Sequence, residues 1–221
     1  QSDDHRMKIR MQQSMAGKKG LTFGVTMTIG EYAVIPSLAR FLKAHPQWEI
    51  HICYGNTQTL LSRLREGTLD FAIVEGYFRE DLYTTRILQK EPFIGVASSK
   101  HIFQKPVSCL RDLTGERLLL REHGSGTRAI LTKILALNNL SAEDFSHIIE
   151  IENIHAIDSL LREDCGISFL YQSAVQKELE DKTLIEIPLS DFKIAHDFSF
   201  IWNKDSIFSA QYEAIFQELQ K

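Results

Sequence analysis

The sequence has no excess of positive charge. Its 25 Lys and Arg residues are outnumbered by 29 Asp and Glu residues, which gives a net charge of −4. Proteins that bind the phosphate backbone of nucleic acids have an excess of Lys and Arg. We therefore do not expect the 221 residues by themselves to bind duplex DNA.

Cysteines are few, and no CxxC pair or Cys/His cluster is present. Cys53, Cys109 and Cys165 lie in or beside apolar runs, which predicts buried free thiols in a reducing compartment, and we expect the cytoplasm. No histidine has a carboxylate four residues away within one helical run, and no two carboxylates are placed for acid–base work. We therefore expect no metal, no cofactor and no enzymatic activity.

The chain also lacks long apolar runs. No stretch of 18 uncharged apolar residues occurs, and the first residues, QSDDHRMKIRMQQ, contain charges where a signal peptide has an apolar segment. The sequence predicts neither a membrane span nor an uncleaved signal peptide.

What the sequence does contain is an alternation of strand-like and helical patterns. We expect strands at 21–28, 48–55 and 69–76 and helices at 30–46 and 56–67, an order typical of a parallel sheet covered by helices. A second series begins with a strand at 91–99 and continues with a helix at 126–139. Further strands are expected at 146–152, 166–170 and 196–203, and helices at 154–164, 171–181 and 208–221.

Two such series favour an α/β fold with two small lobes over one large sheet. We place lobe I at residues 20–92 and 196–221 and lobe II at 93–195, so that the chain crosses twice between the lobes. Hinged lobes commonly hold a small ligand between them. A ligand cleft between the lobes is therefore expected.

The stretch REHGSGTR, residues 121–128, precedes one of these helices. Ser125 suits an N-cap, and the unpaired N–H groups of a first helical turn attract an anion. Plain helix capping explains the same residues. The stretch lacks the Lys-Ser/Thr pair of a phosphate-binding P-loop and does not match the nucleophile motif G-x-S-x-G.

Polar residues follow several of the predicted strands. Ligands of open α/β sheets bind at the carboxyl ends of the strands, so we expect these side chains to share a rim, although each could also be a simple cap. They are Thr26, Thr28, Asn56, Thr57, Glu75 and Asn153.

Four stretches together resemble the effector-binding domain of LysR-type transcriptional regulators. The resemblance spans about residue 21 to the C-terminus and is greatest to the subgroup that includes regulators of sulfur assimilation and carbon fixation. The stretches are TIGEYAVIPSLARFLKAHPQWEI, GNTQTLLSRLREGTLDFAIVEG, LLREHGSGTR and IDSLLREDCGISFLYQSAV.

This resemblance implies two Rossmann-like lobes joined by two crossover strands, as in type 2 periplasmic binding proteins, and a bacterial regulator that binds a small effector. DNA binding would belong to an N-terminal winged helix-turn-helix outside these 221 residues. Residues 1–19 would then be a remnant of a linker helix or a disordered tail.

The resemblance, with the strand-end pattern, implies effector-binding residues on both lobes. The sequence departs from the family where His123 and Tyr171 replace a usual proline and Asp164 a usual glycine. The expected residues are Thr26, Thr28, Ile29, Thr57 and Glu75 on lobe I, and His123, Ser125, Gly126, Thr127, Arg128 and Asn153 on lobe II.

We expect the effector to be a small anion, because of the helix N-terminus at Ser125. A periplasmic solute-binding protein for a small anion is an alternative with the same architecture. A small two-lobed α/β enzyme is a second alternative, but it would need a base or metal set that the sequence does not offer.

Two of the expected helices have more apolar residues than one sheet can cover. They contain Leu38, with Tyr32, Ile35 and Leu42, and Ile215, with Tyr212 and Phe216. In the resembled family two such helices pack across a two-fold axis. We therefore expect a homodimer through the helices around Leu38 and Ile215.

Overall fold

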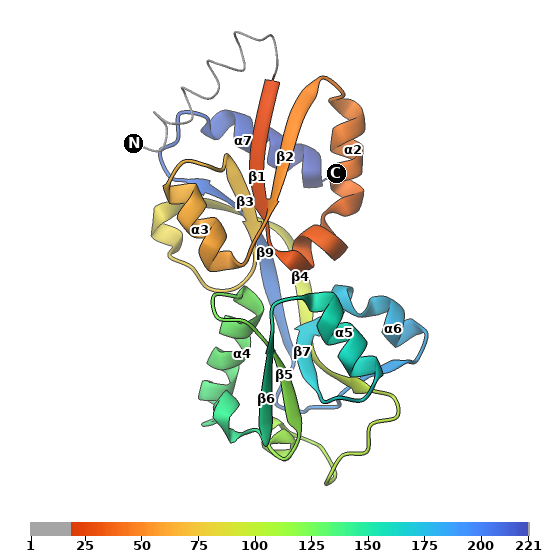
Figure 1. Cartoon of the computed structure of the whole chain (residues 1–221). Coiled ribbons are helices and arrows are strands. Elements are labelled where there is room, and N and C mark those ends of the chain that lie inside the picture. Colours follow the sequence, from red (N-terminus) through yellow and green to blue (C-terminus); the bar gives the residue numbers. More distant parts are fainter. Residues whose placement is uncertain (1–18, 221) are drawn as a thin grey trace. The chain divides into compact units, whose positions relative to one another are not determined.

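The computed structural model describes residues 19–220. The described chain forms two compact units (Figure 1). Unit 1 comprises residues 19–90 and 197–220, and unit 2 comprises Glu91–His196. The segment expected to be a linker-helix remnant or tail lies outside the described residues, except for Lys19, which opens the first strand.

Unit 1 is built on a sheet in which β1 (Lys19–Val25) lies between β2 (Trp48–Tyr54) and β3 (Phe71–Val74) and is parallel to both (Figure 1). The predicted parallel order is confirmed for these three strands. No direction was predicted for β9 (Ile194–Asn203), which runs antiparallel to β3. The β9 strand re-enters unit 1 from unit 2, so no crossover helix sets its direction.

The core of unit 1 is rich in aromatic side chains. Phe71 stacks on Phe23 with ring centroids 4.7 Å apart and on Phe200 at 4.2 Å. Asp70 joins three segments, because its carboxylate accepts the backbone N–H of Thr22 at 2.7 Å and the hydroxyl of Tyr212 at 3.0 Å. These contacts attach the C-terminal helix α7 (Ser209–Gln220) to the sheet.

The helix predicted at 30–46 is divided. A π-helical turn spans Ile29–Ala33, with the Val34 N–H bonded to the Ile29 carbonyl at 2.9 Å, and α2 runs from Ile35 to Ala44. Pro36 lies in the first turn of α2, where its missing N–H costs no hydrogen bond, whereas inside a longer helix its ring would clash with the preceding turn. The proline therefore fixes where the α-helix can begin.

The expectation that both outer helices have apolar surface to spare is wrong for α7. Its apolar residues, Ile215 among them, are buried within unit 1, where α7 packs against α2. Leu38 of α2 is also buried. Of the large apolar side chains of α2, only Ile35 and Leu42, two turns apart, are exposed, at 46% and 40%.

Unit 2 combines antiparallel and parallel pairs. The second half of β4 (Tyr83–Ser98) pairs antiparallel with β7 (Ser168–Tyr171) and β8 (Leu184–Glu186). By contrast, β5 (Arg117–Arg121) and β6 (His147–Ile151) are parallel. The sequence pattern did not predict β5 or β8, because short apolar runs without alternation fit a buried helix segment equally well.

Helices connect these strands in the predicted order. They are α4 (Gly126–Leu137) after β5 and α5 (Ile154–Arg162) after β6. In unit 1, α3 (Thr57–Arg65) follows β2 in the same way. The helix predicted at 171–181 is instead a short 3-10 turn, Gln172–Ala174, followed by α6 (Gln176–Glu180).

Within residues 19–220, no helix has both the length and the apolar character to cross a membrane. No group of three His, Cys, Asp or Glu side chains in this range is arranged to hold a metal ion. The three cysteines are free thiols; Cys53 is buried as expected, whereas Cys109 and Cys165 are half-buried.

Candidate functional site

The predicted residues of unit 1 meet where β1 and β3 end. Thr26 follows β1, and its hydroxyl donates a hydrogen bond to the carboxylate of Glu75, which follows β3. The Thr57 hydroxyl, at the start of α3, donates to the Glu75 backbone carbonyl at 2.8 Å. All three side chains are buried. The strand-end pattern therefore brought together residues that lie 18 to 49 positions apart in the sequence.

Thr28 and Ile29 complete the unit 1 set, which consists of these two residues with Thr26, Thr57 and Glu75. Thr28 is 1% exposed, and its hydroxyl has no hydrogen-bond partner among the described residues. Leaving a buried hydroxyl without a partner costs about 1–3 kcal/mol. Such a cost is relieved when a ligand supplies the partner, so Thr28 is the unit 1 residue best suited to contact one.

The predicted residues of unit 2 surround two helix N-termini. Ser125 is the N-cap of α4, and Asn153 is the N-cap of α5, where its side-chain oxygen accepts the Ala156 N–H at 3.0 Å. The Ser125 hydroxyl oxygen lies 3.5 Å from the backbone nitrogen of Arg128. This is a long contact, so the hydroxyl can also bind a ligand. Gly126 and Thr127 form the buried first turn of α4.

The two N-termini open at the same edge of unit 2. The parallel register pairs Leu120 with Glu150 and Arg121 with Ile151, so β5 and β6 end side by side and α4 and α5 begin there. Each N-terminus presents N–H groups without helical partners and the positive end of a helix dipole. Two of them together favour a bound anion more than either does alone.

Arg128, predicted to bind the effector, already has partners. Its guanidinium forms an ion pair with Glu150 of β6 and donates to the Arg121 carbonyl at 3.0 Å. A further contact of 3.0 Å joins it to Nε2 of His123. The hydrogen bond from Arg128 lowers the pKa of the Glu150 carboxyl below its ordinary value. Arg128 therefore positions the loop and β6, and its charge is already balanced.

The buried cation at this edge is Arg121, which was not predicted as a site residue. Its side chain is 4% exposed and forms a two-point ion pair with Glu122, at 2.8 and 3.1 Å. The Nη1 group is buried and has no partner among the described residues. The sequence signal was an arginine at the end of a short apolar run and four residues before the capping serine. We refer to Arg121 with His123, Ser125, Gly126, Thr127, Arg128 and Asn153 as the unit 2 set.

Comparison with known proteins places this geometry in a family. Residues 17–221 match the family model described as the LysR substrate binding domain. The chain belongs to this family. The match covers both units, and the two-lobed fold expected from the sequence is confirmed.

Curated proteins similar to this LysR substrate-binding domain include transcriptional regulators. A "Probable RuBisCO transcriptional regulator" of Thalassiosira pseudonana is 28% identical over 210 residues, which cover 92% of this chain and 68% of that protein. The "HTH-type transcriptional regulator CysL" of Bacillus subtilis is 26% identical, over 83% of this chain and 61% of its own length. The domain thus spans about two thirds of the regulators it matches.

Solved structures show the same fold. The CcmR regulatory domain of Synechocystis PCC6803, in complex with 2-PG, superposes with a TM-score of 0.80 at 19% identity, covering 92% of this chain and 96% of that one. The effector-binding domain of QuiR in complex with shikimate gives 0.75 at 19% identity, covering 92% and 95%. The family model and the relatives therefore identify the chain as the substrate-binding domain of a LysR-type transcriptional regulator.

Proposed function

We propose that this LysR substrate-binding domain senses a small anionic effector, which binds at the carboxyl ends of β5 and β6. The observation that carries the proposal is the pair of helix N-termini at Ser125 and Asn153, next to a buried Arg121 whose Nη1 has no partner in the described chain. These groups provide hydrogen-bond donors and positive potential but no nucleophile or base. The domain therefore binds its effector without transforming it.

The unit 1 set offers a different kind of partner to a ligand. The Thr26 hydroxyl donates to Glu75, so towards a ligand it offers lone pairs, while the Thr28 hydroxyl can donate or accept. A hydroxyl group suits such partners better than a second anionic group. The expectation that one effector contacts both sets stays a prediction.

The first test is a set of thermal melts of the domain with sulfate, phosphate, 2-PG and shikimate. At least one anion should raise the melting temperature in a saturable way, because a ligand that binds only the folded state stabilises it. A neutral polyol such as glycerol at the same concentrations is the control. If only neutral ligands raise the melting temperature, the anion proposal is wrong.

Replacing Ser125 with alanine should weaken binding of that anion by about 1–3 kcal/mol, since a hydrogen bond to a charged group is lost. Stability without ligand should fall by about 1 kcal/mol, the usual cost of losing an N-cap. Isothermal titration calorimetry measures the first effect and denaturant unfolding the second.

The matched control is Ser141→Ala. Ser141 caps a 3-10 turn in the same unit but lies before β6, away from the strand ends that hold the unit 2 set. This variant should lose stability without losing affinity. Equal losses of affinity in both variants would mean that Ser125 acts only through folding.

DNA binding is a property that we assign to other parts of the regulator, as the net charge of −4 implies. In a gel shift at low salt, the 221-residue chain should not bind duplex DNA with micromolar or tighter affinity. Tight binding would contradict this assignment. A regulator of transcription works where the DNA is, so we place the protein in the cytoplasm.

We also propose a homodimer, but through the exposed face of α2 and not through α7. Ile35 and Leu42 lie on that face, and β2, next to β1, is an edge strand of the unit 1 sheet. Exposed apolar side chains beside an open strand edge are typical of a surface that another subunit covers. Ile215, which the sequence analysis placed in the dimer interface, is buried in its own chain and cannot contact a partner subunit.

A further inference from the structure

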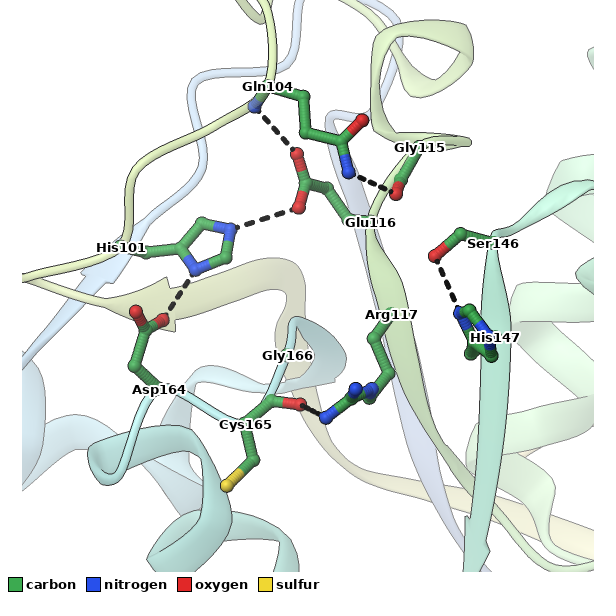
Figure 2. A pocket seen from close by; sticks show the side chains of 10 residues that line it. All are labelled: His101, Gln104, Gly115, Glu116, Arg117, Ser146, His147, Asp164, Cys165 and Gly166. Carbon is green, nitrogen blue, oxygen red and sulfur yellow. Dashed lines mark hydrogen bonds and ion pairs between the residues drawn. The ribbon is translucent and has the colours of Figure 1, made fainter.

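Unit 2 contains a polar pocket of about 370 Å³ away from the effector residues. Its walls come from four segments: the loop after β4, the start of β5, the start of β6 and the turn before β7 (Figure 2). The pocket thus lies at the amino ends of the parallel strands, whereas Ser125 and Asn153 follow their carboxyl ends. A strand of five residues separates the two ends by about 16 Å.

His101 joins two carboxylates in this pocket. Its Nε2 lies 3.2 Å from Glu116 and its Nδ1 lies 2.5 Å from Asp164 (Figure 2). The His101 ring thus lies between the two carboxylates and contacts one with each of its nitrogens. This geometry spreads the two carboxylates to opposite sides of the ring, so they do not converge on one metal ion.

The network leaves one acceptor open. Glu116 is fully used, because its second oxygen accepts the Gln104 N–H at 3.0 Å. The second oxygen of Asp164 has no partner among residues 19–220, and the side chain is 39% exposed. Its backbone has φ of 56°, a conformation that glycine adopts more easily. Asp164 therefore lines the pocket with its carboxylate although its backbone adopts a strained conformation.

The pocket also leaves donors open. Arg117 makes one hydrogen bond, from Nη1 to the Cys165 carbonyl at 3.3 Å, and has no ion pair with any described residue (Figure 2). A guanidinium has five N–H donors, so four remain for a ligand. Planar pairs of such donors match a carboxylate.

These charges decide which ligand fits. The pocket is lined by the guanidinium of Arg117 and the carboxylates of Glu116 and Asp164, so it presents charges of both signs and suits neither a simple anion nor a simple cation. The pocket therefore contains unused guanidinium donors of Arg117 and an unused carboxylate oxygen of Asp164. We propose that this pocket binds a small zwitterion of the free amino acid class, with its carboxylate on Arg117 and its ammonium group on Asp164. The volume lies at the lower end of the range for small-molecule sites.

A ¹H–¹⁵N NMR titration of the 221-residue chain with glycine and with L-alanine tests the proposal. Saturable shifts are expected at the amides of Arg117, His147 and Gly166, with a dissociation constant below about 10 mM, whereas Ser125 and Asn153 stay unchanged. Acetate and methylammonium, which each have one half of the zwitterion, should bind at least about ten-fold more weakly, since each loses a charged hydrogen bond. Equal binding of acetate, shifts centred on Ser125, or no saturable shift would overturn the proposal.

Two variants localise the contacts. Arg117→Met keeps the length of the side chain and removes the donors, and Asp164→Gly removes the acceptor at a position whose φ glycine tolerates. Each should weaken glycine binding about ten-fold or more. Arg111→Met, an exposed arginine of the same unit outside the pocket, is the matched control and should bind glycine like the parent. Ser125→Ala should also leave glycine binding unchanged, so failure here and failure of the effector proposal are distinguishable.

Discussion

Replacing Arg121 with methionine is expected to weaken binding of the anionic effector about a hundred-fold. The buried guanidinium is paired with Glu122, but its Nη1 has no partner among the described residues and can donate to the effector. A hydrogen bond between charged groups contributes about 1.5–3 kcal/mol, which corresponds to roughly ten-fold to 150-fold in affinity. We expect the upper end of this range because the donor gives up no other partner when the ligand binds. Isothermal titration calorimetry with the anion identified by thermal melts measures the change.

Two further variants separate charge from folding. Arg121→Met also leaves Glu122 without its partner, which lowers stability by itself. Glu122→Gln breaks the same pair but keeps the arginine, so it should lose stability while its affinity stays within about three-fold, well under the loss of a charged hydrogen bond. Arg121→Lys should recover part of the affinity. If Glu122→Gln loses as much affinity as Arg121→Met, the arginine acts through structure and not by contacting the effector.

Local rules predicted much of the candidate site. Ser125 and Asn153 were expected at helix starts, and the structure shows both as N-caps, because capping depends on a few neighbouring residues. The meeting of Thr26, Thr57 and Glu75 followed from a rule about strand ends. Predicting that these three residues meet required no knowledge of distant packing beyond the order of the strands.

The missed features depend on residues far apart in the sequence. Arg128 looked like the ligand cation from its position, but its partner Glu150 lies 22 residues later, on the next strand. Arg121 lies on a strand that the sequence pattern did not predict, and only packing leaves its Nη1 buried without a partner among the described residues. In the same way, the apolar pattern of α7 could not tell whether Ile215 faces its own sheet or another subunit. Amphipathic periodicity gives the direction of burial but not the identity of the covering surface.

Leu42→Glu is expected to convert a homodimer to a monomer. Leu42 is 40% exposed on α2, two turns from Ile35 on the same face, so a charge there would be buried without a partner at the interface. A stable dimer interface buries roughly 1,200–2,000 Å² in total, and apolar side chains at its centre dominate the affinity. Sedimentation velocity at tens of micromolar should give twice the mass of the chain for the parent and the mass of one chain for the variant.

Leu82→Glu is the control, because Leu82 has the same exposed fraction as Leu42 and lies in unit 1 on a 3-10 turn instead of α2. It should remain dimeric. Leu38→Glu is unsuitable, since Leu38 is buried in its own unit and a charge there would unfold the chain. A monomeric parent would refute the dimer. A dimer that survives Leu42→Glu would instead move the interface off α2, and the exposed Ile148 and Ile149 on β6, beside β5, would be the next surface to change.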